Sequence, residues 1–120
     1  MATADSRNKQ TVETYLDGFR RNDHAQILSC LTDDVEWHIP GSVHLVGKEA
    51  FDREIENPEF QGSPAITVER VIEEDDVVVA EGAVQARKRS GGILHLVFCD
   101  VFVMENGKIK QLTSYLMEDK

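Results

Sequence analysis

The stretch LHLVFCDVFVMENG, residues 94–107, decides the fold of this chain. It is almost wholly apolar as far as Met104, and it ends in Asn-Gly, the dipeptide typical of a two-residue hairpin turn. We therefore predict a strand over 93–105 and an antiparallel partner strand over 108–116. Asp100 interrupts the apolar run, and a carboxylate inside a strand is costly unless it has a partner or a task.

Alternate side chains of the first of these strands point to opposite faces of the sheet. One face carries Leu94, Leu96, Phe98, Asp100, Phe102 and Met104, and the other carries His95, Val97, Cys99, Val101 and Val103. Both faces are mainly apolar, so both need to be covered. Helices can cover only one face. We expect the other to pack on a second copy of the chain, because a monomer would expose an unusually large apolar patch.

The remaining sequence predicts three helices around one short strand, followed by a four-strand antiparallel meander, which is an α+β layout. The first helix has one apolar face, formed by Val12, Tyr15, Leu16 and Phe19 at helical spacing. Asp5 or Ser6 suits its N-cap, and Asp23 followed by Gln26 suits the start of the second helix. The predicted helices cover 7–21, 24–31 and 48–56, and the predicted strands cover 35–39, 66–73, 77–89, 93–105 and 108–116, with 57–64 as a loop.

Length and composition limit the class of protein. A chain of 120 residues suits one domain, residues 1–120, and its net charge of −9 opposes nucleic acid or an anionic membrane as a partner. The N-terminus has no apolar core and no run reaches the ~18 apolar residues of a membrane span, so we expect neither signal peptide nor membrane segment. Cys30 and Cys99 suggest reduced thiols in the cytoplasm.

Metal and cofactor chemistry have no support in the sequence. The four histidines are scattered, and none stands at a metal-ligand spacing. No glycine-rich dinucleotide loop follows a predicted strand. We therefore expect neither a metal nor a cofactor.

The order of elements resembles the nuclear transport factor 2-like superfamily, which includes SnoaL-like polyketide cyclases and ketosteroid isomerases. The resemblance is carried by YLDGFRRNDHAQILSCLTDDVEWHIPG (15–41), by Gly47 before the third helix and by CDVFVMENGKIKQLTSYL (99–116). It implies a cone, in which a curved antiparallel or mixed sheet wraps around three helices and encloses an apolar pocket. It also implies a homodimer through the outer sheet face, in agreement with the two apolar faces of the 93–105 strand.

Two residues match the oxyanion hole of the isomerase branch. There, a tyrosine on the first helix and a protonated aspartic acid on a late strand bind the ligand oxygen; Tyr15 and Asp100 match these positions. The general base of that branch stands just before the proline that ends the first strand, and Ile39 occupies this position here. The resemblance thus implies the acid half of the site, and it does not extend to steroid isomerisation itself.

Burial of Asp100 would allow its side chain to act as a hydrogen-bond donor. An apolar cavity raises the pKa of a carboxyl group, and the neutral acid can then donate a hydrogen bond beside a tyrosine hydroxyl. From the residues alone, two other interpretations stay open. Asp100 could pair with a Lys, an Arg or a backbone N–H, and Tyr15 could simply fill the core.

The remaining candidates are a base and the walls of the pocket. His38 and His44 are the candidate bases; His38 points away from Trp37 and Ile39 unless a bulge rotates it, and His44 lies in a predicted loop near the mouth of the cone. A wall and a core residue cannot be separated by pattern. The candidate walls are Phe19, Val35, Trp37, Ile39, Phe51, Phe98, Phe102, Leu112 and Leu116.

These observations predict a small-molecule enzyme that performs cofactor-free acid/base chemistry, as an isomerase, cyclase, hydratase or dehydratase, on an apolar carbonyl, enol or polyketide-like ligand. Two alternatives remain open. One is non-catalytic binding of an apolar ligand, and the other is a dimerisation module with a vestigial pocket.

Overall fold

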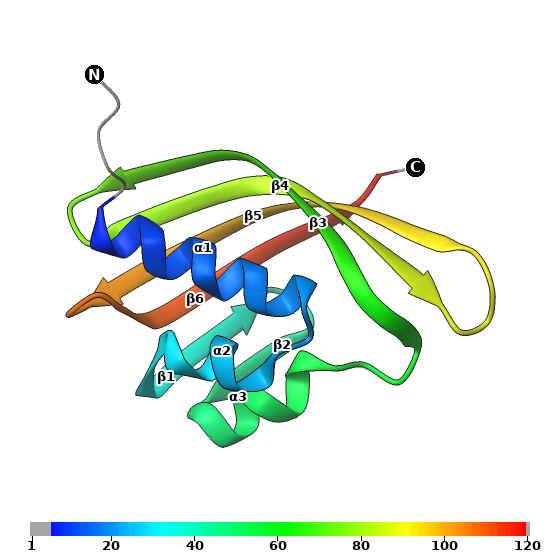
Figure 1. The fold of residues 1–120 in the computed structure, drawn as a ribbon, viewed down its shortest axis with the longest axis horizontal. Coiled ribbons are helices and arrows are strands. Elements are labelled where there is room, and N and C mark those ends of the chain that lie inside the picture. Colours follow the sequence, from blue (N-terminus) through cyan, green and yellow to red (C-terminus); the bar gives the residue numbers. More distant parts are fainter. Residues whose placement is uncertain (1–5, 120) are drawn as a thin grey trace.

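Three helices lie on one face of a curved sheet in the computed structural model, which describes residues 6–119 (Figure 1). Within these residues, six strands form the sheet, in the order β2-β1-β6-β5-β4-β3. The elements are α1 (Arg7–Arg20), α2 (His24–Ser29), β1 (Leu31–Ile39), β2 (Val43–Val46), α3 (Lys48–Ile55), β3 (Phe60–Glu74), β4 (Val77–Lys88), β5 (Ile93–Glu105) and β6 (Lys108–Glu118).

The sheet is mixed. Strands β3 to β6 form the predicted antiparallel meander, and β1 runs parallel to β6. The curved sheet does not close, and α1 lies across its inner face (Figure 1). The predicted α+β cone of sheet and helices is therefore confirmed.

The helices begin where the sequence predicts. The Ser6 side chain caps α1 by accepting a hydrogen bond from the Lys9 N–H, while Asp5 lies outside the described residues. Asp23 caps α2 by accepting from the Gln26 N–H at 3.0 Å. The predicted apolar face of α1 is turned to the core, because Val12 is fully buried and Tyr15 and Leu16 nearly so.

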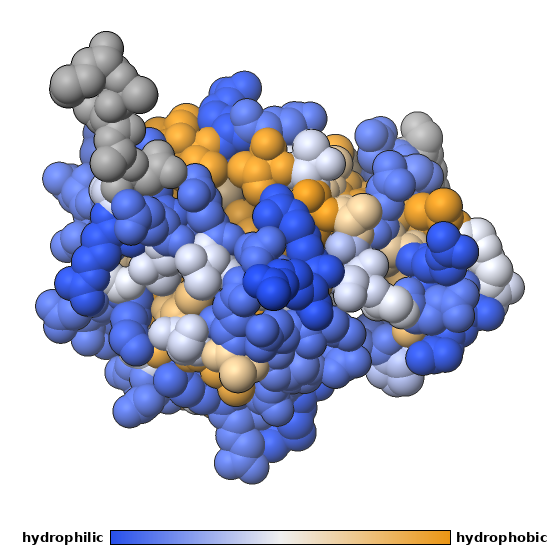
Figure 2. Space-filling view, viewed as in Figure 1, coloured by the Kyte–Doolittle hydropathy of each residue, from blue (hydrophilic) through white to orange (hydrophobic). Residues whose placement is uncertain are grey.

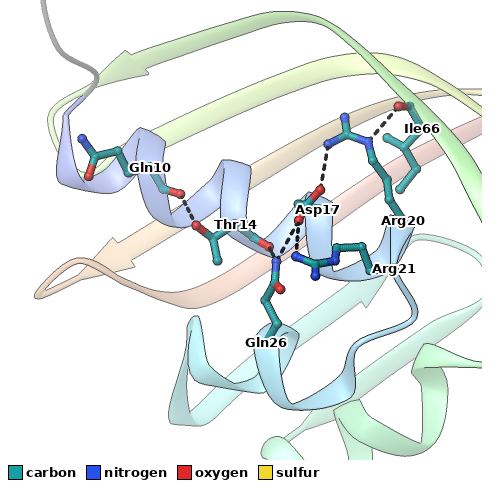
Figure 3. Close-up of polar contacts among 7 residues, drawn as sticks. All are labelled: Gln10, Thr14, Asp17, Arg20, Arg21, Gln26 and Ile66. Carbon is teal, nitrogen blue, oxygen red and sulfur yellow. Dashed lines mark hydrogen bonds and ion pairs between the residues drawn. The ribbon is translucent and has the colours of Figure 1, made fainter.

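Polar contacts fix the C-terminal half of α1 to its neighbours (Figure 3). The Arg20 Nε–H donates to the backbone oxygen of Ile66 in the edge strand β3 at 3.0 Å. The Gln26 amide of α2 donates to the Thr14 carbonyl oxygen at 2.9 Å and to Asp17 at 3.2 Å. These contacts tie α1 to β3 and α2.

Helix α2 is also tied to α3 through His24. Its two ring nitrogens contact the carboxylates of Asp52 at 2.6 Å and Glu56 at 2.5 Å. These hydrogen bonds raise the pKa of His24.

Three predicted boundaries were wrong because pairing across the sheet extends the strands. Helix α2 ends at Ser29, since Leu31 pairs with Ile109 of β6. The loop predicted around His44 contains β2, which forms a hairpin with β1. Strand β3 begins at Phe60, inside the predicted loop, where it pairs with Lys88.

A bulge in β6 changes which side chains face inward. The register between β5 and β6 shifts by one residue between Met104–Ile109 and Val103–Gln111, which leaves Lys110 as the extra residue. Ile109 and Leu112 are consequently both buried, although strict alternation would place them on opposite faces.

The described helices have no membrane-spanning character. Across residues 6–119, no helix combines the length and the hydrophobicity that a membrane crossing requires.

Candidate functional site

A pocket of about 180 Å³ lies between the second half of α1 and the inner face of the sheet. Its walls are mainly apolar. On the helix side of the molecule the surface is mostly hydrophilic, and hydrophobic residues reach it next to α1 (Figure 2). The pocket is lined by Tyr15, Leu16, Phe19, Trp37, Pro64, Ile66, Val84, Leu96, Phe98, Asp100, Ser114 and Leu116.

Asp100 projects from the middle of β5 onto this inner face. It is only 8% exposed, and its buried Oδ1 atom has no hydrogen-bond partner among residues 6–119. Burial raises the pKa of this carboxyl to about 7, against a smaller lowering by a hydrogen bond from Ser114. Among residues 6–119, no lysine or arginine forms an ion pair with it. Burial thus favours the neutral, protonated form of this carboxyl.

Tyr15 enters the pocket from α1 through a cluster of aromatic rings. Its ring makes edge contacts with Phe19, Phe51 and Phe102 at centroid distances of 5.1, 6.1 and 5.5 Å. Burial raises the pKa of its hydroxyl well above the usual value, and the charges of Asp100 and Cys30 raise it further. The hydroxyl therefore stays protonated and serves as a hydrogen-bond donor.

Ser114 joins this site, although the sequence analysis did not single it out. It stands directly opposite Asp100 in the β5–β6 ladder and is 4% exposed. Its Oγ accepts a hydrogen bond from the Trp37 Nε1–H at 3.0 Å. The Asn106–Gly107 turn is the only signal in the sequence for strand pairing here, and counting back from it pairs Asp100 with Thr113. The bulge at Lys110 shifts the pairing by one residue and brings Ser114 opposite Asp100 instead.

The structure separates the predicted wall residues into two groups. Phe19, Trp37, Phe98 and Leu116 line the pocket. The others are part of the core or lie beside it: Val35, Phe51, Phe102 and Leu112 are buried in the core, and the half-buried Ile39 packs against it. Sequence reasoning missed Leu16, Pro64, Ile66, Val84 and Leu96 as lining residues.

The two candidate bases do not reach the pocket. His38 and His44 are exposed neighbours on β1 and β2, with ring centroids 5.4 Å apart. Strand pairing aligns the two histidines with Thr113 and Val101. The side chains of this row lie on the outer face of the sheet, whereas Asp100 lies on the inner face. The prediction of a loop that brings His44 to the mouth of the cone was wrong, because β2 continues the sheet there.

A second, larger hollow of about 570 Å³ lies on the outer side of the sheet, and its outer-face residues include Val97, Cys99, Tyr115 and Met117. An Arg70–Glu81 ion pair of 3.2 Å borders it. We assign the functional site to the smaller pocket, because that one is lined both by the buried Asp100 and by Tyr15. No group of three metal-ligating side chains occurs in the described part of the chain.

Comparisons with known proteins agree with this architecture. The sequence model of the SnoaL-like domain matches residues 12–112. TerC, co-crystallised with polyporic acid, has 24% identity and a TM-score of 0.84, with 95% of this chain and 92% of TerC covered. No curated protein shows a significant sequence match.

Two further structures share the fold. An LEH-like epoxide hydrolase of M. tuberculosis has 16% identity and a TM-score of 0.82, covering 92% of this chain and 83% of the hydrolase. An NTF2-like protein of Burkholderia pseudomallei has 25% identity and a TM-score of 0.82, covering 96% and 92%. With the family model spanning most of its length, the chain belongs to the SnoaL-like domain family of the nuclear transport factor 2-like superfamily.

Proposed function

We propose that the chain binds an apolar ligand through a carbonyl, enol or phenol oxygen and performs cofactor-free acid/base chemistry on it. One observation carries the proposal. A buried Asp100 carboxyl, with an unpartnered oxygen, lines an apolar pocket together with Tyr15. A buried polar atom without a partner calls for an explanation, and a ligand oxygen supplies one.

The two groups suit the stabilisation of negative charge. The Tyr15 hydroxyl and the neutral Asp100 acid donate hydrogen bonds that strengthen as charge develops on the ligand oxygen. In the fraction of molecules in which Asp100 is ionised, its carboxylate can instead accept a proton from the ligand, while the Tyr15 hydroxyl alone donates to the ligand oxygen. Enolisation and the reactions built on it, isomerisation, cyclisation and hydration or dehydration, need one group that takes a proton and one that donates to the oxygen.

The relatives are consistent with small-molecule chemistry on this fold. TerC was crystallised with polyporic acid, and another neighbour is an epoxide hydrolase. At these identities the likeness supports the fold, so the choice of ligand rests on the pocket.

The Tyr15→Phe substitution is expected to weaken binding of an ionised nitrophenol about ten- to a hundredfold, the loss of one hydrogen bond to a charged group. Wild-type affinity should also fall about tenfold per pH unit above the pKa of Asp100, because binding then requires proton uptake. The Asp100→Asn variant should lose this slope, since its amide does not titrate. Fluorescence or absorbance titration between about pH 6 and about pH 9 measures both effects.

Tyr115→Phe is the matched control, because Tyr115 is exposed on the outer face. It should bind the nitrophenol like the wild type. Equal affinity in the wild type, Tyr15→Phe and Asp100→Asn at every pH would contradict the proposal.

Non-catalytic binding is the second candidate, favoured by the apolar Ile39 at the position of the expected base. Proton exchange decides between the two. An enzyme should accelerate exchange of the α-protons of a bound apolar ketone in D₂O, followed by NMR, and Asp100→Asn should abolish it. Binding without exchange would favour a carrier or sensor.

We further propose a homodimer through the outer face of the sheet. Seven large hydrophobic side chains are exposed within residues 6–119, and the ladder places six of them on this face. The exposed fractions of Val97, Tyr115 and Met117, at its centre, are 40%, 54% and 70%. The six are Val46, Ile72, Ile93, Val97, Tyr115 and Met117.

Combining Val97→Lys with Met117→Lys is expected to give a monomer, because two buried charges per subunit would face each other across the interface. Sedimentation velocity at micromolar concentration measures this. Ala25→Lys, on the exposed surface of α2, is the control and should sediment like the wild type. A monomeric wild-type protein would contradict the proposed dimer.

A further inference from the structure

A buried chain of polar groups leads from Trp37 through Ser114 to Asp100. The indole Nε1–H of Trp37 lies 3.0 Å from Ser114 Oγ, and both residues are buried. Ser114 in turn faces Asp100 across the β5–β6 ladder. The chain thus connects three strands, β1, β6 and β5, immediately beside the pocket.

Hydrogen-bond direction is fixed along this chain. An indole N–H only donates, so Ser114 Oγ is the acceptor in that contact. The serine proton remains free to be donated, and the buried carboxyl group of Asp100 stands directly opposite it in the ladder. The contact with Trp37 therefore limits the orientations that the serine hydroxyl can adopt.

The two oxygens of Asp100 differ in their surroundings. Oδ1 is buried and has no hydrogen-bond partner among residues 6–119, so a serine hydroxyl that donates to this carboxyl would reach its other oxygen, Oδ2. In a neutral carboxylic acid, the accepting oxygen is the carbonyl oxygen and the other carries the proton. An acid whose Oδ2 accepts from Ser114 consequently carries its proton on Oδ1.

We propose that Ser114, oriented by the Trp37 indole, is a positioning residue that donates to Oδ2 of Asp100 and so directs the acid proton to Oδ1. The role of Ser114 rests on the proposed function in one respect: the proton on Oδ1 is donated to the oxygen of a bound ligand. The serine has a second effect. By donating to the carboxyl it favours the ionised form, and so keeps the acid from becoming permanently protonated in its apolar surroundings.

The other titratable groups near Asp100 lie in the pocket or on the outer face of the sheet. Tyr15 of α1 faces the same pocket and interacts electrostatically with Asp100, and Cys30 acts on Tyr15 in turn. Cys99 and Glu81 lie on the outer face of β5 and β4, where the charges of Glu81 and Asp100 raise the pKa of Cys99. Ser114 is thus the neighbour that lowers the pKa of Asp100.

The test is the titration of the Asp100 carboxyl carbon by ¹³C NMR in the ligand-free protein. Ser114→Ala should raise the midpoint by about one to two pH units, the loss of one hydrogen bond to a charged group. Ser114→Thr should restore the wild-type midpoint, because it restores the hydroxyl. Trp37→Phe should raise the midpoint by less than Ser114→Ala, since the serine remains but is no longer oriented.

Ser42→Ala, in the exposed turn between β1 and β2, is the matched control and should leave the midpoint unchanged. A folded Ser114→Ala protein with the wild-type midpoint would overturn the assignment, and so would a Ser114→Thr protein that titrates like Ser114→Ala. Near-ultraviolet circular dichroism verifies the fold of each variant. Because no ligand is present, this result is independent of the nitrophenol titration that tests the proposed function.

Discussion

Asp100→Asn is expected to stabilise the protein by roughly 4 kcal/mol at about pH 8. Burial raises the pKa of Asp100 from 3.8 in the unfolded chain to about 7 in the folded protein. Above the folded value the carboxyl is ionised in both states, and only the folded state holds that charge in an apolar pocket. The asparagine side chain fills nearly the same space without a charge.

The sign of this effect reverses the usual behaviour of a paired carboxylate. A raised pKa gives a contribution that is fully present below the unfolded value near pH 4 and is lost as the pH rises through about 7. The advantage of Asp100→Asn should thus vanish at about pH 4 and grow towards pH 8. Urea unfolding of both proteins across this range measures it.

Asp76→Asn is the control for the loss of one negative charge, because Asp76 is exposed. It should change the free energy of unfolding little. If Asp100→Asn gave an equally small difference at about pH 8, the Asp100 carboxyl would not be buried in its neutral form. The proposed role of Asp100 as a hydrogen-bond donor would then be contradicted.

Gly82→Ala is expected to destabilise the protein by at least about 3 kcal/mol, beyond the usual range for overpacking, because the clash is with backbone. A Cβ at Gly82 would lie 2.0 Å from the Thr67 carbonyl oxygen of β3 and 2.9 Å from the Phe98 ring. Thr67 stands beside the bulge that bends β3 over β4. A methyl group would push β3 away and disturb Phe98, a wall of the pocket.

Gly41→Ala separates this clash from the loss of glycine's conformational freedom. Gly41 has a φ of 79°, but a Cβ there would meet nothing within 4 Å. Its substitution should cost about 1–2 kcal/mol, the strain of a left-handed alanine. Guanidinium unfolding of both variants tests the comparison, and equal costs would show that β3 moves aside easily.

Local pattern predicted most of the elements and failed at their ends. The apolar spacing of α1 and the Asn106–Gly107 turn depend on backbone geometry within a few residues, and both predictions were confirmed. The end of α2 and the start of β3 depend on partners far along the chain, such as Ile109 for Leu31 and Lys88 for Phe60. No local signal reports those partners.

In the candidate site, too, local pattern predicted some features, and others depended on distant strands. Alternation along β5 places Asp100 with Phe98 and Phe102, and alternation along β1 turns His38 away from Trp37, because successive side chains of a strand point to opposite faces. Counting back from the turn pairs Asp100 with Thr113, whereas the bulge at Lys110 brings Ser114 opposite it. A register shift of one residue therefore introduced a polar neighbour that pattern alone could not identify.

The sequence by itself determined the helices, the meander, the apolar faces and the presence of one carboxyl in an apolar strand, since each follows from periodicity within one element. Only the tertiary structure decided which face of β5 meets α1, that Tyr15 and Asp100 line one pocket, and that Trp37 and Ser114 stand behind the carboxyl. The physical reason is that the curvature and bulges of the sheet arise from contacts among distant strands. They set long-range register and distance, which no local repeat encodes.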